Sequence, residues 1–222
     1  MFSPDLIRNL ALTLVVMLLS LSVHEFAHAL AADRLGDDTP RSQGRLTLSP
    51  LEHYDVFGTF LIPVVAAFLG HIPMIGWARP VQFNPTRLSR RVSMRTGTMI
   101  IAAAGPLSNL ALAVISYVVL VLCDRAGILQ SQAGGEPARA FLSAMVLTNL
   151  GLFVFNLLPI PPLDGSRLLP RRFDSVLERV SQFSFIILLV VIGRFSGVIS
   201  RPVFWLLSLL EGVAHAPIGG IA

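Results

Sequence analysis

The stretch Leu18-Leu-Ser-Leu-Ser-Val-His24-Glu-Phe-Ala-His28-Ala-Leu-Ala-Ala32 places three ionisable side chains near the end of a long apolar run. The run begins at about residue 6, and its length predicts a helix that crosses a membrane. An alternative is a cleavable signal peptide, since residues 29–31 form an A-x-A site. A signal peptide does not need two histidines and a glutamate beside its cut, and the rest of the chain is also hydrophobic. We therefore expect a retained helix.

The composition of the whole chain points to lipid as its main solvent. Of 222 residues, 54% are hydrophobic and 14% are charged, and the mean hydropathy is +0.72. Further apolar segments occupy residues 56–75, 97–122, 140–158 and 183–210. We expect one all-α polytopic membrane domain, 1–222, with four to six transmembrane helices. The catalytic core would span about 5–170, and a C-terminal helical region 180–215. Every one of the 17 basic residues is arginine, and these arginines are better explained as topology signals than as a nucleic-acid surface. No feature indicates an oligomeric state.

The pattern His24-Glu25-x-x-His28 has the spacing of a metal site on a helix. Residues four apart share one helix face, so both imidazoles can reach one ion while Glu25 stands beside it. Catalytic zinc takes three protein ligands and keeps a fourth position for water. An ionisable residue at mid-membrane costs about 3 kcal/mol, so three together need a compensating role. The alternative is that they lie at the water interface. His24, however, lies about 12 Å of helix before Ala32, which predicts a site inside the hydrocarbon.

A third ligand has to come from elsewhere in the chain. His71 and His215 lack polar companions and are better explained by packing, and the role of His53 is left open. Asp164 is the stronger candidate, because it follows a proline-broken helix end, Pro159-Ile-Pro-Pro162-Leu. Irregular backbone at membrane depth needs protein or a water-filled cavity to cover it. A turn residue before Gly165 is the simpler alternative.

Three motifs in this order resemble those of the site-2 proteases, a family of intramembrane zinc metalloproteases. They are His24-Glu25-x-x-His28, Gly105-Pro106-Leu-Ser-Asn109, and Asn156-x-x-Pro-x-x-Pro-x-Asp164-Gly165. The segments Gly76-Trp-Ala-Arg-Pro80-Val81 and Gly44-Arg-Leu-Thr-Leu resemble the short prokaryotic members without a PDZ domain.

The resemblance implies that His24, His28 and Asp164 bind Zn²⁺, that Glu25 is the catalytic base and that Asn156 assists at the substrate peptide. The substrate would be the transmembrane segment of another protein. A catalytically silent membrane scaffold and a metal-ion transporter are the alternatives.

The site also constrains the topology. Both ligand groups lie toward the C-terminal ends of their segments, so the first and fourth segments must run in the same direction. Segment 56–75, which contains Pro63, Gly70 and Pro73, is then expected to be re-entrant. The arginine-rich loops share one side, which predicts an active site toward the cytoplasm of a prokaryotic inner membrane. We also expect a small β-hairpin near the site, in which the strand Gly44–Ser49 or the segment Gly76–Val81 pairs with the substrate.

Overall fold

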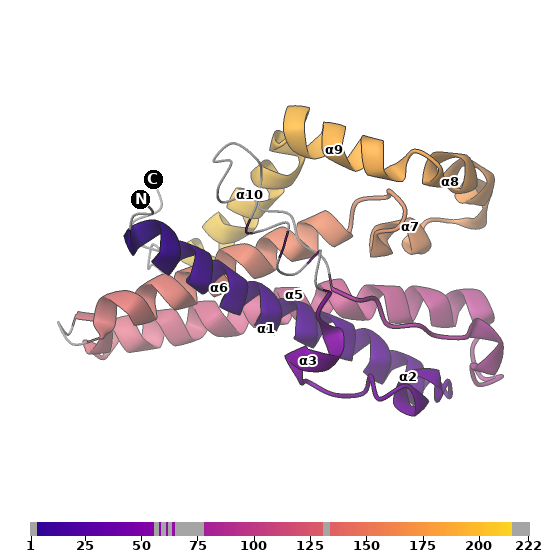
Figure 1. Cartoon of the computed structure of the whole chain (residues 1–222), viewed down its shortest axis with the longest axis horizontal. Helices are drawn as coiled ribbons and strands as arrows, with labels where there is room; N and C mark the ends of the chain where they lie inside the picture. The colour runs from indigo at the N-terminus through magenta and orange to yellow at the C-terminus, as the bar shows by residue number, and fades with distance from the viewer. Residues whose placement is uncertain are drawn as a thin grey trace.

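The structure is a computed structural model that describes residues 4–55, 58, 61, 64, 78–130 and 134–214. Within these ranges the regular structure is entirely helical (Figure 1). The long helices are α1 (Pro4–Arg34), α5 (Met94–Arg125), α6 (Gly135–Asn156) and α10 (Gly197–Ala214). The shorter helices are α2 (Thr39–Ser42), α3 (Pro50–His53), α7 (Asp164–Leu168), α8 (Asp174–Ser181) and α9 (Ser184–Arg194), with 3₁₀ turns η2 (Pro85–Arg87), η3 (Ile128–Gln130) and η4 (Arg171–Phe173).

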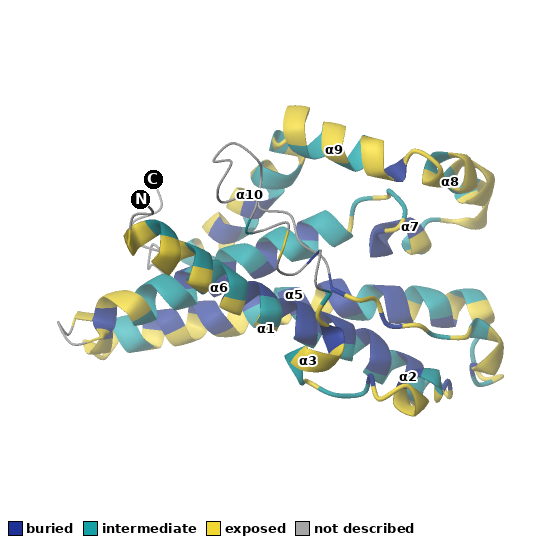
Figure 2. Cartoon of the chain, in the orientation of Figure 1, coloured by how far each residue is buried: buried dark blue, intermediate teal, exposed yellow. Residues whose placement is uncertain are grey.

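Helices α1, α5, α6 and α10 are long and apolar enough to cross a membrane. A fifth crossing is added if η4–α8 and α9, which bend by 88° at a short break, form one span. The count agrees with the four to six helices expected from the sequence. The outward faces of these helices carry many exposed apolar side chains, among them Leu107, Ile115 and Leu122 of α5 (Figure 2). Such an apolar surface is more stable in contact with lipid than with water. The protein is therefore a multi-pass integral membrane protein.

Helices α1 and α6 run in the same direction and α5 runs against them (Figure 1). An ion pair between Arg8 and Glu136, 3.9 Å apart, joins the starts of α1 and α6 and supports this arrangement. Helices α1 and α6 are therefore parallel, as expected from the requirement that His24, His28 and Asp164 reach one ion. The apolar segment 56–75 that was expected to be re-entrant lies almost wholly outside the described residues.

The main core lies between α5, α6 and α10. Ala113, Val146 and Leu150 are completely buried there, and Val203 of α10 closes the cluster. Helix α1 packs against both α5 and α6. His24 and His28, together with Ala29 and Ala32 near the end of α1, are buried in this packing.

The expected small β-hairpin is wrong for the part of the chain that the structure describes. Residues 45–49 form an irregular loop whose backbone groups bond locally. The N–H of Arg45 donates to the carbonyl of Pro40 (2.8 Å), and the carbonyl of Thr47 pairs with Nε2 of His53 (2.7 Å). A side chain thus takes a backbone group that a partner strand would need, and Pro50 starts α3 directly afterwards.

Candidate metal centre

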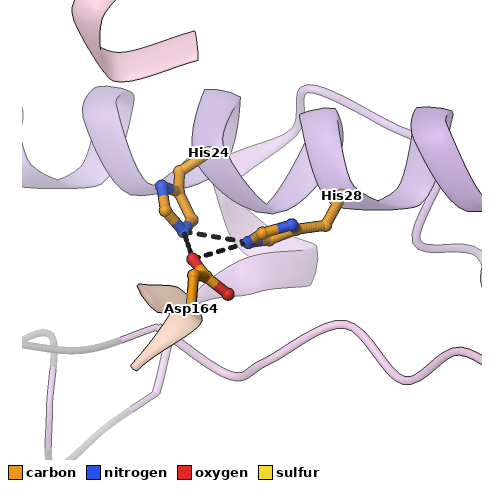
Figure 3. A group of neighbouring side chains, drawn as sticks. All are labelled: His24, His28 and Asp164. Atoms are coloured by element: carbon orange, nitrogen blue, oxygen red, sulfur yellow. Dashed lines mark hydrogen bonds and ion pairs between the residues drawn. The ribbon is translucent and has the colours of Figure 1, made fainter. Parts of the chain in front are cut away.

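His24, His28 and Asp164 meet at one point inside the protein (Figure 3). Nε2 of each histidine lies 3.2 Å from Oδ2 of Asp164, and the two Nε2 atoms lie 3.0 Å apart. All three side chains are buried. The histidines stand one turn apart on α1, while Asp164 is the first residue of α7, just beyond the end of α6. The sequence prediction that a distant carboxylate joins the two imidazoles is therefore matched by the geometry.

The three ligand atoms fit a zinc ion. Bonds of about 2.0–2.1 Å in a tetrahedron separate neighbouring ligand atoms by about 3.4 Å. The observed separations of 3.0–3.2 Å are a few tenths shorter than this value. Two imidazoles and one carboxylate are also a ligand set of catalytic zinc, which leaves one position for water.

Each histidine is held through its other ring nitrogen. Nδ1 of His24 lies 2.6 Å from Oδ1 of Asn109, and Nδ1 of His28 lies 2.7 Å from the backbone carbonyl of Ile101. Both partners belong to α5. Such contacts fix the orientation of metal-binding imidazoles and direct Nε2 toward the ion.

Gly105 of α5 makes the close approach of α5 and α1 feasible. A Cβ atom on this residue would lie 2.4 Å from Nε2 of His28 and 2.6 Å from Nε2 of His24, well inside ordinary contact. Gly165 plays a similar part for α7, since its Cβ would lie 2.3 Å from the carbonyl oxygen of Leu157. These two glycines let the metal ligands converge.

Asp164 lies outside the spanning helices and is strongly affected by its neighbours. Burial alone would raise its pKa, but hydrogen bonds and charge interactions with His24 and His28 outweigh burial and hold the pKa below its ordinary value. The carboxyl group is therefore ionised at neutral pH, which is the form that binds metal ions.

Glu25 is buried beside the three ligands but is not one of the group that converges. Its Oε2 accepts a hydrogen bond of 2.8 Å from the backbone N–H of Val81. Val81 lies in a segment without regular secondary structure, 78–84, which is anchored by the N–H of Arg79 donating to the carbonyl of His53 (2.8 Å). The glutamate is thus oriented by backbone that runs past the metal group.

A cavity of about 710 Å³ contains the metal group. Glu25, Val81 and Asn156 also line it, and its further walls are largely apolar, with Phe155 of α6 and Leu188 of α9 among them. The Nδ2 of Asn156 donates to the carbonyl of Leu152 one turn earlier, at 3.0 Å. Asn156 therefore lines the cavity that contains the metal group, and its expected assistance at the substrate peptide stays a prediction.

The other histidines do not join this group in the described structure. His53 is buried at the end of α3, where its Nε2 pairs with the Thr47 carbonyl, so its role in the structure is to hold the loop between α2 and α3. His71 and His215 lie outside the described residues.

Sequence reasoning assigned no role to Asn109, beyond its place in a motif, and missed Asn149 and the carbonyl of Ile101. A polar residue in the middle of each apolar segment was the available signal for the two asparagines. No side-chain pattern could have indicated the carbonyl.

A bundle of membrane helices that buries a His–His–carboxylate group beside a glutamate defines a class: the zinc-dependent hydrolases of membranes. Comparison with protein families makes the assignment specific. The model described as Peptidase family M50 matches residues 12–133 and 125–200, and the chain belongs to this family. The resemblance to site-2 proteases is thereby confirmed.

Relatives carry names of the same kind. The Bacillus subtilis protein named "Putative zinc metalloprotease YwhC" is 40% identical over 191 residues, which cover 84% of this chain and 81% of that protein. A Mycobacterium tuberculosis protein named "Putative zinc metalloprotease Rip2" is 34% identical over 208 residues, 89% of this chain and 73% of that protein. Its Mycolicibacterium smegmatis namesake is 34% identical over 200 residues, with coverage of 86% and 72%. No solved structure gives a significant match.

The family, these names and the three converging ligands agree on zinc as the cofactor and support a metalloprotease.

Proposed function

We propose that this chain is an intramembrane zinc endopeptidase that cuts a peptide bond in or near the transmembrane helix of another protein. The observation that carries the proposal is the buried group of His24, His28 and Asp164 with Glu25 beside it, inside a bundle of apolar helices. The apolar walls of the cavity suit a hydrophobic segment.

In the proposed mechanism His24, His28 and Asp164 hold the zinc ion. Bound zinc would supply a water of pKa about 7 and polarise the carbonyl of the scissile peptide bond. Glu25 accepts the proton of the attacking water and returns it to the leaving amine. The hydrogen bond from the Val81 N–H holds the Glu25 carboxylate in place for both transfers. Asn156, at the edge of the cavity, donates a hydrogen bond to the carbonyl oxygen as negative charge develops there.

The segment 78–84 supports a further part of the proposal. Its backbone forms neither helix nor strand, and Val81 within it bonds directly to Glu25. A substrate helix has all its amides bonded internally, so it must unwind before water can attack one of them. A non-helical segment next to the base would offer backbone groups to the unwound strand, as in other cases of peptide binding by strand addition.

The direct test is Glu25→Gln, with Glu178→Gln on the exposed face of α8 as the matched control. The Glu25 variant should retain zinc, because it keeps all three ligands, and should lose cleavage. Membrane fractions of cells that express wild type, Glu25→Gln or Glu178→Gln would be compared by quantitative peptide mass spectrometry. Uncut transmembrane segments should accumulate with Glu25→Gln and not with Glu178→Gln. Identical peptide profiles in all three strains would refute the assignment of the base.

We further propose that the metal end of the bundle faces the cytoplasm of a prokaryotic cell. The loops 35–55, 78–93 and 157–183 all lie at this end (Figure 1), and residues 78–93 carry Arg79, Arg87, Arg90 and Arg91 with no acidic residue. Basic loops remain in the cytoplasm.

A cysteine introduced at exposed Ser175 should react with a membrane-impermeant thiol reagent in inside-out vesicles, and one at exposed Ala126 in right-side-out vesicles, both in a Cys123→Ser background. The reverse pattern would overturn the orientation.

A further inference from the structure

The metal group is backed by a chain of buried polar side chains that joins three helices. Asn109 of α5 contacts His24, Asn149 of α6 contacts Asn109, and Ser20 of α1 contacts Asn149. Asn109, Asn149 and Ser20 are all completely buried. We propose that Asn149 is a positioning residue: acting through Asn109, it sets the tautomer of His24 so that Nε2 is free to bind metal. The inference rests on the proposed role of His24 as a zinc ligand.

This network of hydrogen bonds starts at a backbone carbonyl, which can only accept a hydrogen bond. The Nδ2 of Asn149 lies 2.8 Å from the carbonyl oxygen of Met145 and 2.8 Å from Oγ of Ser20. A side-chain amide has one NH₂ and one oxygen, so facing Met145 with its NH₂ group turns its oxygen the other way. That oxygen lies 2.9 Å from Nδ2 of Asn109 and accepts its hydrogen bond.

The orientation is then passed on to the histidine. Asn109 directs its NH₂ toward two acceptors, Oδ1 of Asn149 and the carbonyl oxygen of Ser20 (3.4 Å). Its own Oδ1 must therefore face His24, at 2.6 Å from Nδ1. A ring nitrogen opposite an amide oxygen has to carry the proton, and a neutral imidazole has only one. Nε2 of His24 is left with its lone pair directed at Asp164 and the metal position.

The arrangement differs between the two histidines. His28 is set by the backbone carbonyl of Ile101, which cannot rotate. His24 depends on an amide that could rotate by half a turn if nothing held it. Rotation of Asn109 would place its NH₂ group against Nδ1–H and its oxygen against that of Asn149, two unfavourable buried contacts between like groups. Asn149 of α6 opposes this rotation because its Oδ1 accepts a hydrogen bond from the NH₂ group of Asn109.

The test is a double-mutant cycle read by zinc affinity rather than by proteolysis. The full chain in detergent would be titrated against a chromophoric zinc chelator for wild type, Asn149→Ala, Asn109→Ala and the double variant. Asn149→Ala should weaken zinc binding by about tenfold, in the range for residues that orient metal ligands. The same change should have less than a twofold effect when Asn109 is already alanine, because Asn149 then has no route to His24.

Two further variants separate positioning from simple packing. Ser20→Ala removes an equally buried polar group but leaves the Met145 carbonyl to orient Asn149, so zinc affinity should fall less than threefold. Asn149→Asp, as the neutral carboxylic acid, keeps the shape of the side chain, an O–H that donates to the Met145 carbonyl and an oxygen that faces Asn109, and its affinity should also stay within threefold of wild type. Because Asn149→Asp is isosteric, it remains informative if Asn149→Ala does not fold.

The inference is overturned if Asn149→Ala weakens zinc binding by the same factor in wild type and in the Asn109→Ala variant. A tenfold loss of zinc affinity in Asn149→Asp would also overturn it. Failure of the metal site itself has a different signature, because wild type would then bind no zinc. Failure of the proposed proteolytic function would instead appear as peptide profiles that Glu25→Gln leaves unchanged.

Discussion

Gly105→Ala provides the sharpest perturbation of the metal centre, because the added atom points at both histidines. The new Cβ would lie 2.4 Å from Nε2 of His28 and 2.6 Å from both Nε2 and Cε1 of His24, whereas ordinary contact begins at 3.4 Å. The two rings would have to retreat by about 1 Å, although metal–ligand distances tolerate only about 0.2 Å. We expect zinc affinity to fall at least about 100-fold, which corresponds to about 2.8 kcal/mol.

A matched control is available in the neighbouring helix. Gly151 of α6 has open space where its Cβ would be, with no atom within 4 Å. Gly151→Ala should leave zinc affinity within twofold of wild type while making the same change of helix propensity, about 1 kcal/mol. Both variants would be purified in detergent, equilibrated in zinc–chelator buffers and analysed for bound metal by mass spectrometry. Zinc affinity of Gly105→Ala within threefold of wild type would refute the reasoning that this glycine makes room for the ligands.

Other predictions follow from single residues. Asp164→Asn should lose most bound zinc, since a neutral amide replaces the anionic ligand, and retained stoichiometric zinc by elemental analysis would contradict this. Gly165→Ala, whose Cβ would lie 2.3 Å from the Leu157 carbonyl oxygen, should weaken zinc binding at least about tenfold in the same chelator titration, while Gly193→Ala in open space should not. Leu150→Ala, at a fully buried core position, should lower the free energy of unfolding by about 2–5 kcal/mol, and a detergent-based unfolding titration that shows less than 1 kcal/mol would contradict it.

The sequence predicted the metal group well because its evidence was local. Two histidines one turn apart on an apolar helix have few physical explanations, and a carboxylate after a proline-broken helix end was a ready partner. The direction of α1 relative to α6 followed from the same requirement. Each of these inferences used the type and spacing of side chains, which a sequence displays directly.

The features that the sequence did not predict depend on which groups meet in space. Asn149 looks like any polar residue in an apolar helix until α6 packs against α1 and α5. The hydrogen bond from His28 ends on the backbone of Ile101, and backbone carries no sequence signal. The expected strand at residues 45–49 was wrong because His53 bonds to the Thr47 carbonyl, a contact that only the folded loop creates.

Zinc K-edge X-ray absorption on the purified chain in lipid nanodiscs tests the central claim most directly. With one zinc per chain, the spectrum should show two imidazole nitrogens together with oxygen ligands at about 2.0–2.1 Å, and His24→Ala should reduce the imidazole count or remove the metal. A chain that carries no zinc after equilibration with buffered metal, or a spectrum unchanged in His24→Ala, would contradict a zinc site built from His24, His28 and Asp164.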